Sequence, residues 1–247
     1  MAKYKQECIF GIRAVLEAIQ QGKEVEKVMF KTGIRGELFQ QLFQEIRTQG
    51  IHFQYVPEDA FKAFSDRNHQ GVLAEISPVP YQDLDEVLDE LSTTDKVPFV
   101  LILDRVTDVR NFGAIVRSAE CAGVDAIVIP TKNSAKISSD ALKTSAGALY
   151  HLPICKVQNL KKIVRELKFQ RGFQILAASE KAEKFYTEAD MTTALAVIMG
   201  SEDKGIDEDL LNISTDKIKI PQKGKIDSLN VSAAAAVIVF EVVRQRN

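Results

Sequence analysis

Apolar residues in the first third of the chain recur with two different spacings. In segments 11–21 and 36–49 they return every three or four residues, as on one face of an α-helix. Pro57 opens a further short helical segment that ends near residue 64. Between these helices lie short alternating or apolar stretches that predict strands, at 25–30, 51–56 and 71–76. We therefore predict a small α/β domain over residues 1–78.

An acidic segment separates this domain from the rest of the chain. It begins with Pro78 and Pro80 and continues as a predicted helix with five carboxylates, at Asp83, Asp85, Glu86, Asp89 and Glu90. Such a run predicts a solvated face and a poor surface for RNA. We predict that residues 79–95 form an acidic linker between two domains.

Longer apolar runs characterise the remainder, residues 96–247. The segment 98–103 (PFVLIL) is unbroken in its apolar character, as in strands that are buried on both faces. Helical and strand-like segments then alternate to the end of the chain, with strands predicted at 125–129, 152–157, 172–177, 194–199 and 218–220 and helices at 111–122, 138–144, 160–168, 207–211 and from about 231. This alternation predicts a mostly parallel sheet that is covered by helices on both faces, with a ligand site at the carboxyl ends of its strands.

Composition narrows the class of protein. The chain has 247 residues, of which 45% are apolar and 27% charged, and a formal net charge of −2. Its three cysteines and three histidines are scattered, which predicts neither disulfides nor a metal site. Residues 1–10 lack the apolar core of a signal peptide, and the apolar run 231–240 is too short to span a bilayer. We expect a cytoplasmic protein.

Three polar loops follow apolar strands of the second domain, at 104–117, 200–205 and 220–232. They contain no glycine fingerprint for dinucleotides, no phosphate-binding loop and no serine nucleophile elbow. What they offer is backbone, small residues and a few polar side chains, namely Asn111, Arg117, Glu202, Ser228 and Asn230. This inventory favours chemistry in which a cofactor brings its own leaving group and the protein aligns the reactants.

Each of these side chains also has an ordinary structural explanation. Asn111, Ser228 and Asn230 could cap the helices that begin beside them. Arg117 could pair with a glutamate one turn further along its helix, and Glu202 could be a solvated loop charge. The residues taken singly leave these alternatives open.

Taken together and in order, the three loops resemble a known family. The segments NFGAIVR (111–117), MGSEDKGI (199–206) and IPQKGKIDSLNVSAAAA (220–236) resemble the three motifs of the TrmH/SpoU family of RNA ribose 2′-O-methyltransferases, within the SPOUT superfamily. The segments FGIRAV (10–15), HQG (69–71) and KTSAGALYHLP (143–153) are similar to 23S ribosomal RNA guanosine methyltransferases of the RlmB type. The resemblance covers nearly the whole chain.

The resemblance implies a fold, a cofactor and partners. It implies a deep trefoil knot in the C-terminal domain, an L30e-like RNA-binding domain before it, S-adenosylmethionine as methyl donor, a homodimer, and 23S ribosomal RNA as substrate. By motif position, it places cofactor contacts at Gly200, Ile220 and Leu229, and catalytic roles at Asn111, Arg117, Glu202, Ser228 and Asn230. In the second motif Asp203 stands where the family usually has glycine, which matters if the backbone there needs a positive φ.

Several functional questions stay open at this point. The family mechanism makes Arg117 a general base, but a guanidinium stays protonated in proteins, so an electrostatic or phosphate-binding role is physically easier. The substrate could be transfer RNA, the enzyme could protect a ribosome against an antibiotic, or the chain could be a non-catalytic ribosome-assembly protein. With so small a net charge, RNA binding needs clustered cations; candidates in the second domain are Arg105, Arg110, Lys132, Lys136, Lys143, Lys223 and Lys225.

Overall fold

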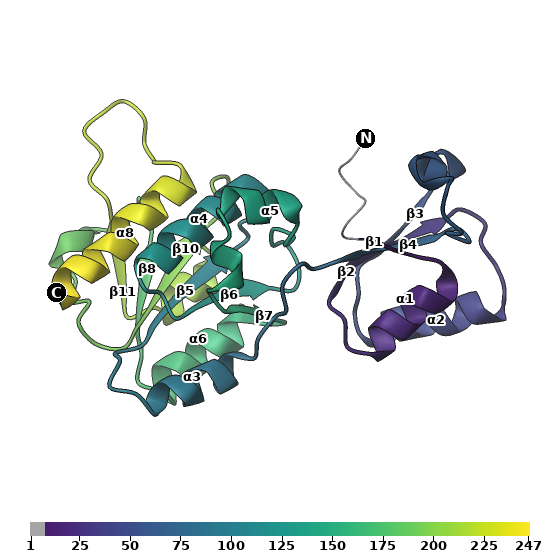
Figure 1. The fold of residues 1–247 in the computed structure, drawn as a ribbon. Helices are drawn as coiled ribbons and strands as arrows, with labels where there is room; N and C mark the ends of the chain where they lie inside the picture. The colour runs from purple at the N-terminus through teal and green to yellow at the C-terminus, as the bar shows by residue number, and fades with distance from the viewer. Residues whose placement is uncertain (1–7) are drawn as a thin grey trace. The chain divides into compact units, whose positions relative to one another are not determined.

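The computed structural model describes residues 8–247 and divides into two compact units. The first unit comprises the residues up to Pro80 together with Ile137–Ser139, and the second comprises Tyr81–Lys136 and Asp140–Asn247. Figure 1 shows both units as α/β structures. Across the described part of the chain, no helix is both long and apolar enough to cross a membrane, and no three potential metal ligands gather at one place.

The first unit is built on a four-stranded sheet with the order β1-β4-β2-β3. Its elements are β1 (Cys8–Phe10), α1 (Ile12–Gln20), β2 (Val25–Lys31), α2 (Glu37–Thr48), β3 (Phe53–Val56), η1 (Glu58–Phe64) and β4 (Val72–Ile76). β2 and β3 are parallel, whereas β4 is antiparallel to both β1 and β2. The sequence predicts all of these except β1, which is too short to show an alternating pattern.

Alternation along the strands of this sheet separates two apolar layers. Val28 and Phe30 of β2 pack with α1 and α2, whereas Met29 packs with Phe61 and Phe64 of η1. Successive strand residues point to opposite faces, so the two α-helices cover one face and the 3₁₀ helix covers the other.

The second unit contains a seven-stranded sheet with the order β7-β6-β5-β10-β8-β11-β9. Every pair of neighbouring strands is parallel, as the alternation of strands and helices predicts. The strands are β5 (Phe99–Asp104), β6 (Ala126–Pro130), β7 (Ile154–Val157), β8 (Gln174–Ala178), β9 (Lys184–Phe185), β10 (Leu195–Gly200) and β11 (Asp216–Lys219). All six residues of β5 are buried, which explains its unbroken apolar sequence.

Helices cover both faces of this sheet (Figure 1). One layer contains α3 (Leu84–Ser92), α6 (Leu160–Phe169) and α7 (Glu208–Ile213), whose leucines share a core with alternate residues of the central strands. On the opposite face α4 (Val109–Cys121) and α8 (Val231–Arg246) lie side by side. The remaining elements are α5 (Ser139–Thr144), η2 (Ala148–Tyr150) and η3 (Tyr186–Glu188).

The predicted linker 79–95 contains a helix that belongs to the second unit. Leu84, Val87 and Leu88 of α3 are buried in the core beneath the sheet. The carboxylates lie on the outer side, where Arg171 donates to Asp85 and Asp89 at 2.7 and 2.8 Å. The acidic composition of this segment conceals an apolar stripe at helical spacing, so the segment packs as part of the sheet's covering layer.

Candidate active site

The three polar loops gather at one edge of the large sheet. They follow β5, β10 and β11, and these strands lie with β8 in the order β5-β10-β8-β11. The last residues of β5 and β10, Asp104 and Gly200, are paired in register. Since all four strands are parallel, their carboxyl ends meet at the same edge, and the loops converge there.

The start of α4 presents Asn111 to the neighbouring loops. Asp108 is the N-cap, and its Oδ1 accepts from the backbone N–H groups of Arg110 at 2.7 Å and Asn111 at 3.0 Å. Asn111 is therefore not the capping residue of this helix, and its side chain is available for other partners.

A hydrogen-bonded cluster joins all three motifs. Asn111 Nδ2 donates to Glu202 Oε1 at 3.2 Å, Asn230 Nδ2 donates to Asn111 Oδ1 at 3.0 Å, and Asn230 Nδ2 also donates to Glu202 Oε1. We call Asn111, Glu202 and Asn230 the junction. Its members come from loops that are 91 and 28 residues apart in the chain, so the fold alone brings them together.

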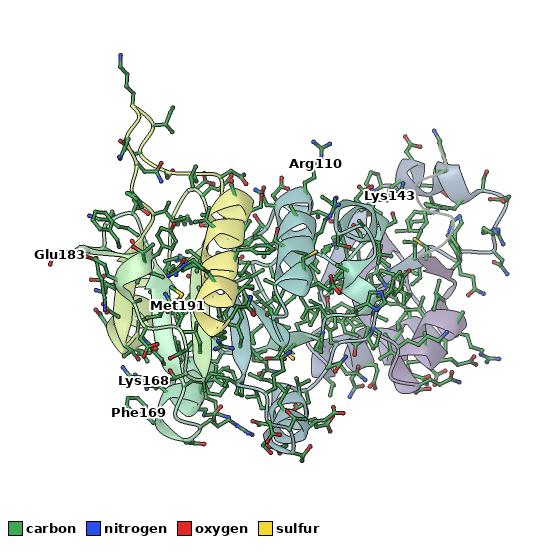
Figure 2. All side chains as sticks on the ribbon, turned by 60° about the vertical axis from the view of Figure 1, so that its left-hand side comes forward. Arg110, Lys143, Lys168, Phe169, Glu183 and Met191 are labelled. Atoms are coloured by element: carbon green, nitrogen blue, oxygen red, sulfur yellow. The ribbon has the colours of Figure 1, made fainter. Side chains whose placement is uncertain are left out.

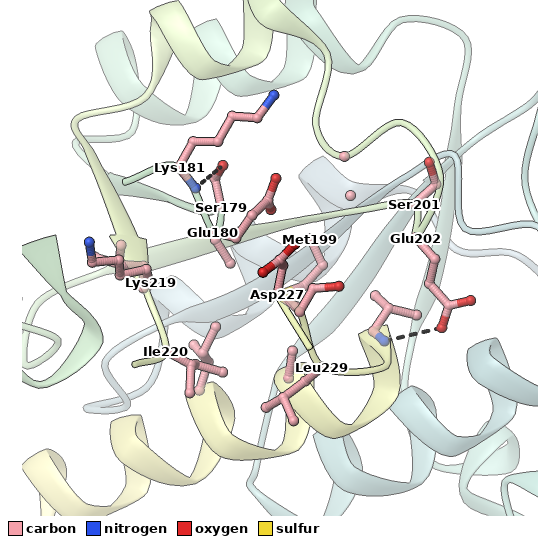
Figure 3. Close-up of a pocket in the computed structure, with 18 of the residues that line it drawn as sticks. Ser179, Glu180, Lys181, Met199, Ser201, Glu202, Lys219, Ile220, Asp227 and Leu229 are labelled. Carbon is pink, nitrogen blue, oxygen red and sulfur yellow. Dashed lines mark hydrogen bonds between the residues drawn. The ribbon is translucent and has the colours of Figure 1, made fainter. Parts of the chain in front are cut away.

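The junction also fixes the beginning of α8. Of the two candidate caps, Ser228 and Asn230, Asn230 is the N-cap, and its Oδ1 accepts from the N–H groups of Ser232 and Ala233 at 3.0 and 3.4 Å. Glu202 Oε1 accepts in addition from Val231 N–H at 3.3 Å (Figure 3). A carboxylate at a helix N-terminus is stabilised by the unpaired amides there, so Glu202 is not merely a solvated loop charge.

Arg117 and Ser228 lie outside the junction. Both are exposed, and neither side chain forms a hydrogen bond or ion pair with any of residues 8–247. Arg117 is six residues beyond Asn111 on α4, which places it on a different side of the helix, and the alternative pairing with Glu120 is not formed within that range. These two side chains remain free for a ligand.

A pocket of about 290 Å³ opens beside the junction. Gly200, Ile220 and Leu229, the three predicted cofactor residues, line it together with Glu202 and Ser228. Figure 3 shows Ile220, Leu229 and Glu202 around it. Asn111, Arg117 and Asn230 are not among its lining residues. This volume is close to the lower end of the range for small-molecule sites.

The pocket has two further walls. One is the end of β8 and the residues that follow it, Ala178 to Lys181, and the other is the inner side of α8 with Ala234 and Ile238. The sequence analysis does not predict the first wall, although Ser179-Glu180-Lys181 follows a buried strand, the same pattern that marks the other loops. The alanine run indicates the second wall, because its small side chains leave room for a ligand.

Gly200 is required where the second motif folds back on itself. A Cβ at this position would lie 2.2 Å from the carbonyl carbon of Gly205 and 2.4 Å from the nitrogen of Ile206. The turn between them carries Glu202 and is closed by Gly205 N–H, which donates to Ser201 O at 2.9 Å. Gly205 has a φ of +63°, whereas Asp203 does not adopt a positive φ, so the departure from the family pattern at position 203 introduces no backbone strain.

Two of the candidate RNA-binding cations project from the end of the unit at which α4 begins. Figure 2 shows Arg110 and Lys143 there and Lys168 and Phe169 at the opposite end. Arg110 and Lys143 have no ion-pair partner among residues 8–247. Arg105, in contrast, turns inward and pairs with Asp104 at 3.0 Å.

Comparison with known proteins connects both units to one group of enzymes. Residues 98–240 match the SpoU rRNA Methylase family, and residues 8–82 match the RNA 2′-O ribose methyltransferase substrate binding family. A putative TrmH family tRNA/rRNA methyltransferase from Staphylococcus aureus (strain MSSA476) is 34% identical over 239 residues, which cover 97% of this chain and 96% of that protein.

Solved structures show the same likeness. The SpoU methyltransferase AviRb from Streptomyces viridochromogenes, in complex with AdoMet, superposes with a TM-score of 0.62 at 21% identity over 97% of this chain and 90% of that one. A TrmH/SpoU tRNA modifying enzyme from A. aeolicus has a TM-score of 0.57 at 30% identity and covers 65% of this chain and 84% of its own.

Proposed function

Because the chain belongs to the SpoU/TrmH family of S-adenosylmethionine-dependent RNA methyltransferases, we propose that it methylates a ribose 2′-hydroxyl of a guanosine in 23S ribosomal RNA. The observation that carries the methyl-transfer part of this proposal is the junction of Asn111, Glu202 and Asn230 beside a pocket lined by Gly200, Ile220 and Leu229. The choice of a guanosine in 23S ribosomal RNA rests on the resemblance of segments 10–15, 69–71 and 143–153 to enzymes of the RlmB type. The match of residues 8–82 to a ribose 2′-O-methyltransferase substrate-binding family supports the ribose as the acceptor.

The pocket suits the methyl donor chemically. Its walls combine Gly200, which has no side chain, with the apolar residues Met199, Ile220, Leu229 and Ile238 and with several polar and charged residues, which fits a ligand with an aromatic base and a polar tail. When bound, S-adenosylmethionine supplies a methyl group on a sulfonium, which is already a good leaving group. We assign Gly200, Ile220 and Leu229 to holding it.

The protein's part in the reaction is to orient the acceptor and to stabilise charge. The junction fixes Glu202 through three donors, so this carboxylate can orient a ribose hydroxyl without moving. Arg117 is exposed and without a partner in residues 8–247, so it can reach a phosphate or stabilise the developing alkoxide as a cation. We assign Ser228, at the pocket mouth, to contact with the cofactor or the RNA.

The test of this proposal is a map of ribose methylation in ribosomal and transfer RNA from cells with and without the gene. We expect one guanosine of 23S ribosomal RNA to lose its 2′-O-methyl group, and purified protein with labelled S-adenosylmethionine to restore it. Loss of a methyl group from transfer RNA instead would replace the proposed substrate and leave the chemistry intact. Tight S-adenosylmethionine binding without transfer to any RNA would favour a non-catalytic ribosome-assembly role.

Two further properties implied by the resemblance stay predictions. They are the trefoil knot, which the second and third motifs would form, and the homodimer; the cytoplasmic location, expected from the scattered cysteines and the first ten residues, is a third prediction. Analytical ultracentrifugation checks the dimer: sedimentation at the monomer mass, 27.5 kDa, at micromolar concentration would contradict it.

A further inference from the structure

Arg105 adopts a backbone conformation that is rare for residues other than glycine. Its φ is +60°, in the left-handed region, directly after the last residue of β5. Asn133, in the same unit, also has a φ of 60°, but asparagine is among the residues that tolerate this region. Asparagine tolerates a positive φ because its short polar side chain can bond to the nearby backbone. The long side chain of arginine forms no such bond, so the surrounding structure must hold Arg105 in this conformation.

The side chain of Arg105 carries a second cost. Its Nη2 donates to Asp104 Oδ2 at 3.0 Å and to Gly205 O at 3.4 Å, while its Nε is buried without a partner among residues 8–247. A buried donor without an acceptor is uncommon in folded proteins. Two unfavourable features thus converge on one residue, next to the turn that carries Glu202.

Asp104 and Arg105 together secure both ends of that turn. Gly200, just before the turn, is the register partner of Asp104 in the sheet. Asp104 is 5% exposed, and its Oδ2 accepts from Asp207 N–H at 2.7 Å, just after the turn. Between these two points the guanidinium of Arg105 binds the carbonyl of Gly205.

We infer that Arg105 is a positioning residue, which holds the 201–205 turn so that Glu202 meets Asn111 and Asn230. Arg105 does not line the pocket, so it acts on the reaction only through the turn. This inference rests on the proposed function for its kinetic consequence, but its structural consequence can be measured separately.

Arg105→Gly is the cleanest test, because glycine adopts a φ of +60° freely and the backbone need not change. The amides of Lys204 and Gly205, which bond to Ser201 at 3.2 and 2.9 Å, report on the turn. We expect their hydrogen exchange to accelerate about tenfold. We also expect kcat for methyl transfer to fall about tenfold, with KM for RNA within about twofold of the wild-type value, since misplaced groups slow the chemical step.

A double-mutant cycle with Glu202→Gln separates positioning from a general effect on the fold. If Arg105 acts through Glu202, Arg105→Gly will change kcat by less than about twofold in the Glu202→Gln background. Asn133→Gly is the matched control, because it changes another residue with a φ of 60° that lies outside the turn, and it should leave kcat and the exchange rates unchanged. If the glycine variant folds poorly, Arg105→Lys can replace it, because lysine keeps a cation beside Asp104 but lacks the guanidinium that also binds Gly205. This variant should lower kcat and accelerate exchange in the same direction but by a smaller factor.

Two results would overturn the inference. One is unchanged exchange at Lys204 and Gly205 in Arg105→Gly, and the other is an equal fall in kcat in both backgrounds of the cycle. If the wild-type protein transfers no methyl group to any RNA, the proposed function fails instead, and the exchange rates still decide whether Arg105 holds the turn.

Discussion

The five predicted catalytic residues divide into two groups that the structure treats differently. Asn111, Glu202 and Asn230 are held by hydrogen bonds to one another and to the start of α8. Arg117 and Ser228 belong to the same motifs but have no partner within residues 8–247. The first group is thus fixed before any ligand arrives, and the second can form its contacts only with a ligand.

This contrast makes stability and activity separable. Changing a free residue should lower methyl transfer at constant stability, because no contact in the folded protein is lost. Changing a residue of the fixed group should lower stability and methyl transfer together, because its hydrogen bonds also hold the turn of the second motif and the cap of α8. The following variants test this separation.

The largest effect is expected from Arg117→Ala. Removing a cation that stabilises the reacting oxygen should reduce kcat/KM for RNA about 100- to 1,000-fold, while the melting temperature stays within about 1 °C of the wild-type value. Steady-state methylation assays and thermal unfolding measure the two quantities. Arg110→Ala, another exposed arginine of the same helix, is the control: it should weaken RNA binding and its salt dependence while leaving kcat unchanged. A large drop in melting temperature for Arg117→Ala would show that this residue stabilises the fold and does not belong to the free group.

Gly200→Ala should disturb the junction through the turn that carries Glu202. The added Cβ would overlap the backbone at Gly205 and Ile206, so the turn that carries Glu202 must shift. We expect a loss of about 1–3 kcal/mol in the free energy of unfolding, together with weaker S-adenosylmethionine binding in calorimetry. Gly224→Ala adds the same methyl group where no atom lies within 4 Å, and it should change neither quantity.

Asn230→Ala should lower stability and activity together. It removes the cap of α8, which costs about 1 kcal/mol, and it removes one donor to Glu202. We expect methyl transfer to fall about tenfold, in line with one lost positioning contact. Denaturant unfolding and the methylation assay provide the comparison. Asn230→Ser restores a capping oxygen but not the amide donor, so recovery of stability without recovery of activity would show that the two roles are separate.

The smallest effect is expected from Ser228→Ala. The hydroxyl has no partner among the described residues, so the free energy of unfolding should change by less than about 0.5 kcal/mol. Loss of a single hydrogen bond to cofactor or RNA should reduce methyl transfer by a factor of about five to ten. An unchanged rate would remove Ser228 from the site and leave Arg117 as the only free catalytic residue of the five.

The sequence predicts the central strands β5, β6, β8 and β10 well because they are largely apolar runs, whereas it does not predict β9, which has only two residues. It also narrows the cap of α8 to Ser228 or Asn230, since short polar residues precede an alanine-rich helix, and Asn230 is the cap. It predicts the helix at α3 but places it in a linker, because charge obscures the apolar stripe of Leu84, Val87 and Leu88. Periodicity reports which face of an element is buried, but not which element it is buried against.

The candidate site shows the same limit more strongly. The motif order identifies Asn111 and Glu202, but local pattern cannot show that they bond to each other across 91 residues. The inward turn of Arg105 is equally invisible, because an arginine at the end of a strand normally indicates a surface cation. The wall formed by Ser179 and Glu180 was available as a pattern and could have been predicted.

The placement of α3 has a consequence for how this chain could exchange modules with its relatives. Recombination that replaced everything before residue 96 would exchange Leu84, Val87 and Leu88 for another protein's residues, which are not matched to the strands they would pack against. A crossover between Pro80 and Tyr81 would carry the helix with the catalytic module and substitute only the RNA-reading part. Chimeras joined at that peptide bond should therefore inherit a new substrate preference with an intact chemical machinery, whereas chimeras joined fifteen residues later should be less stable.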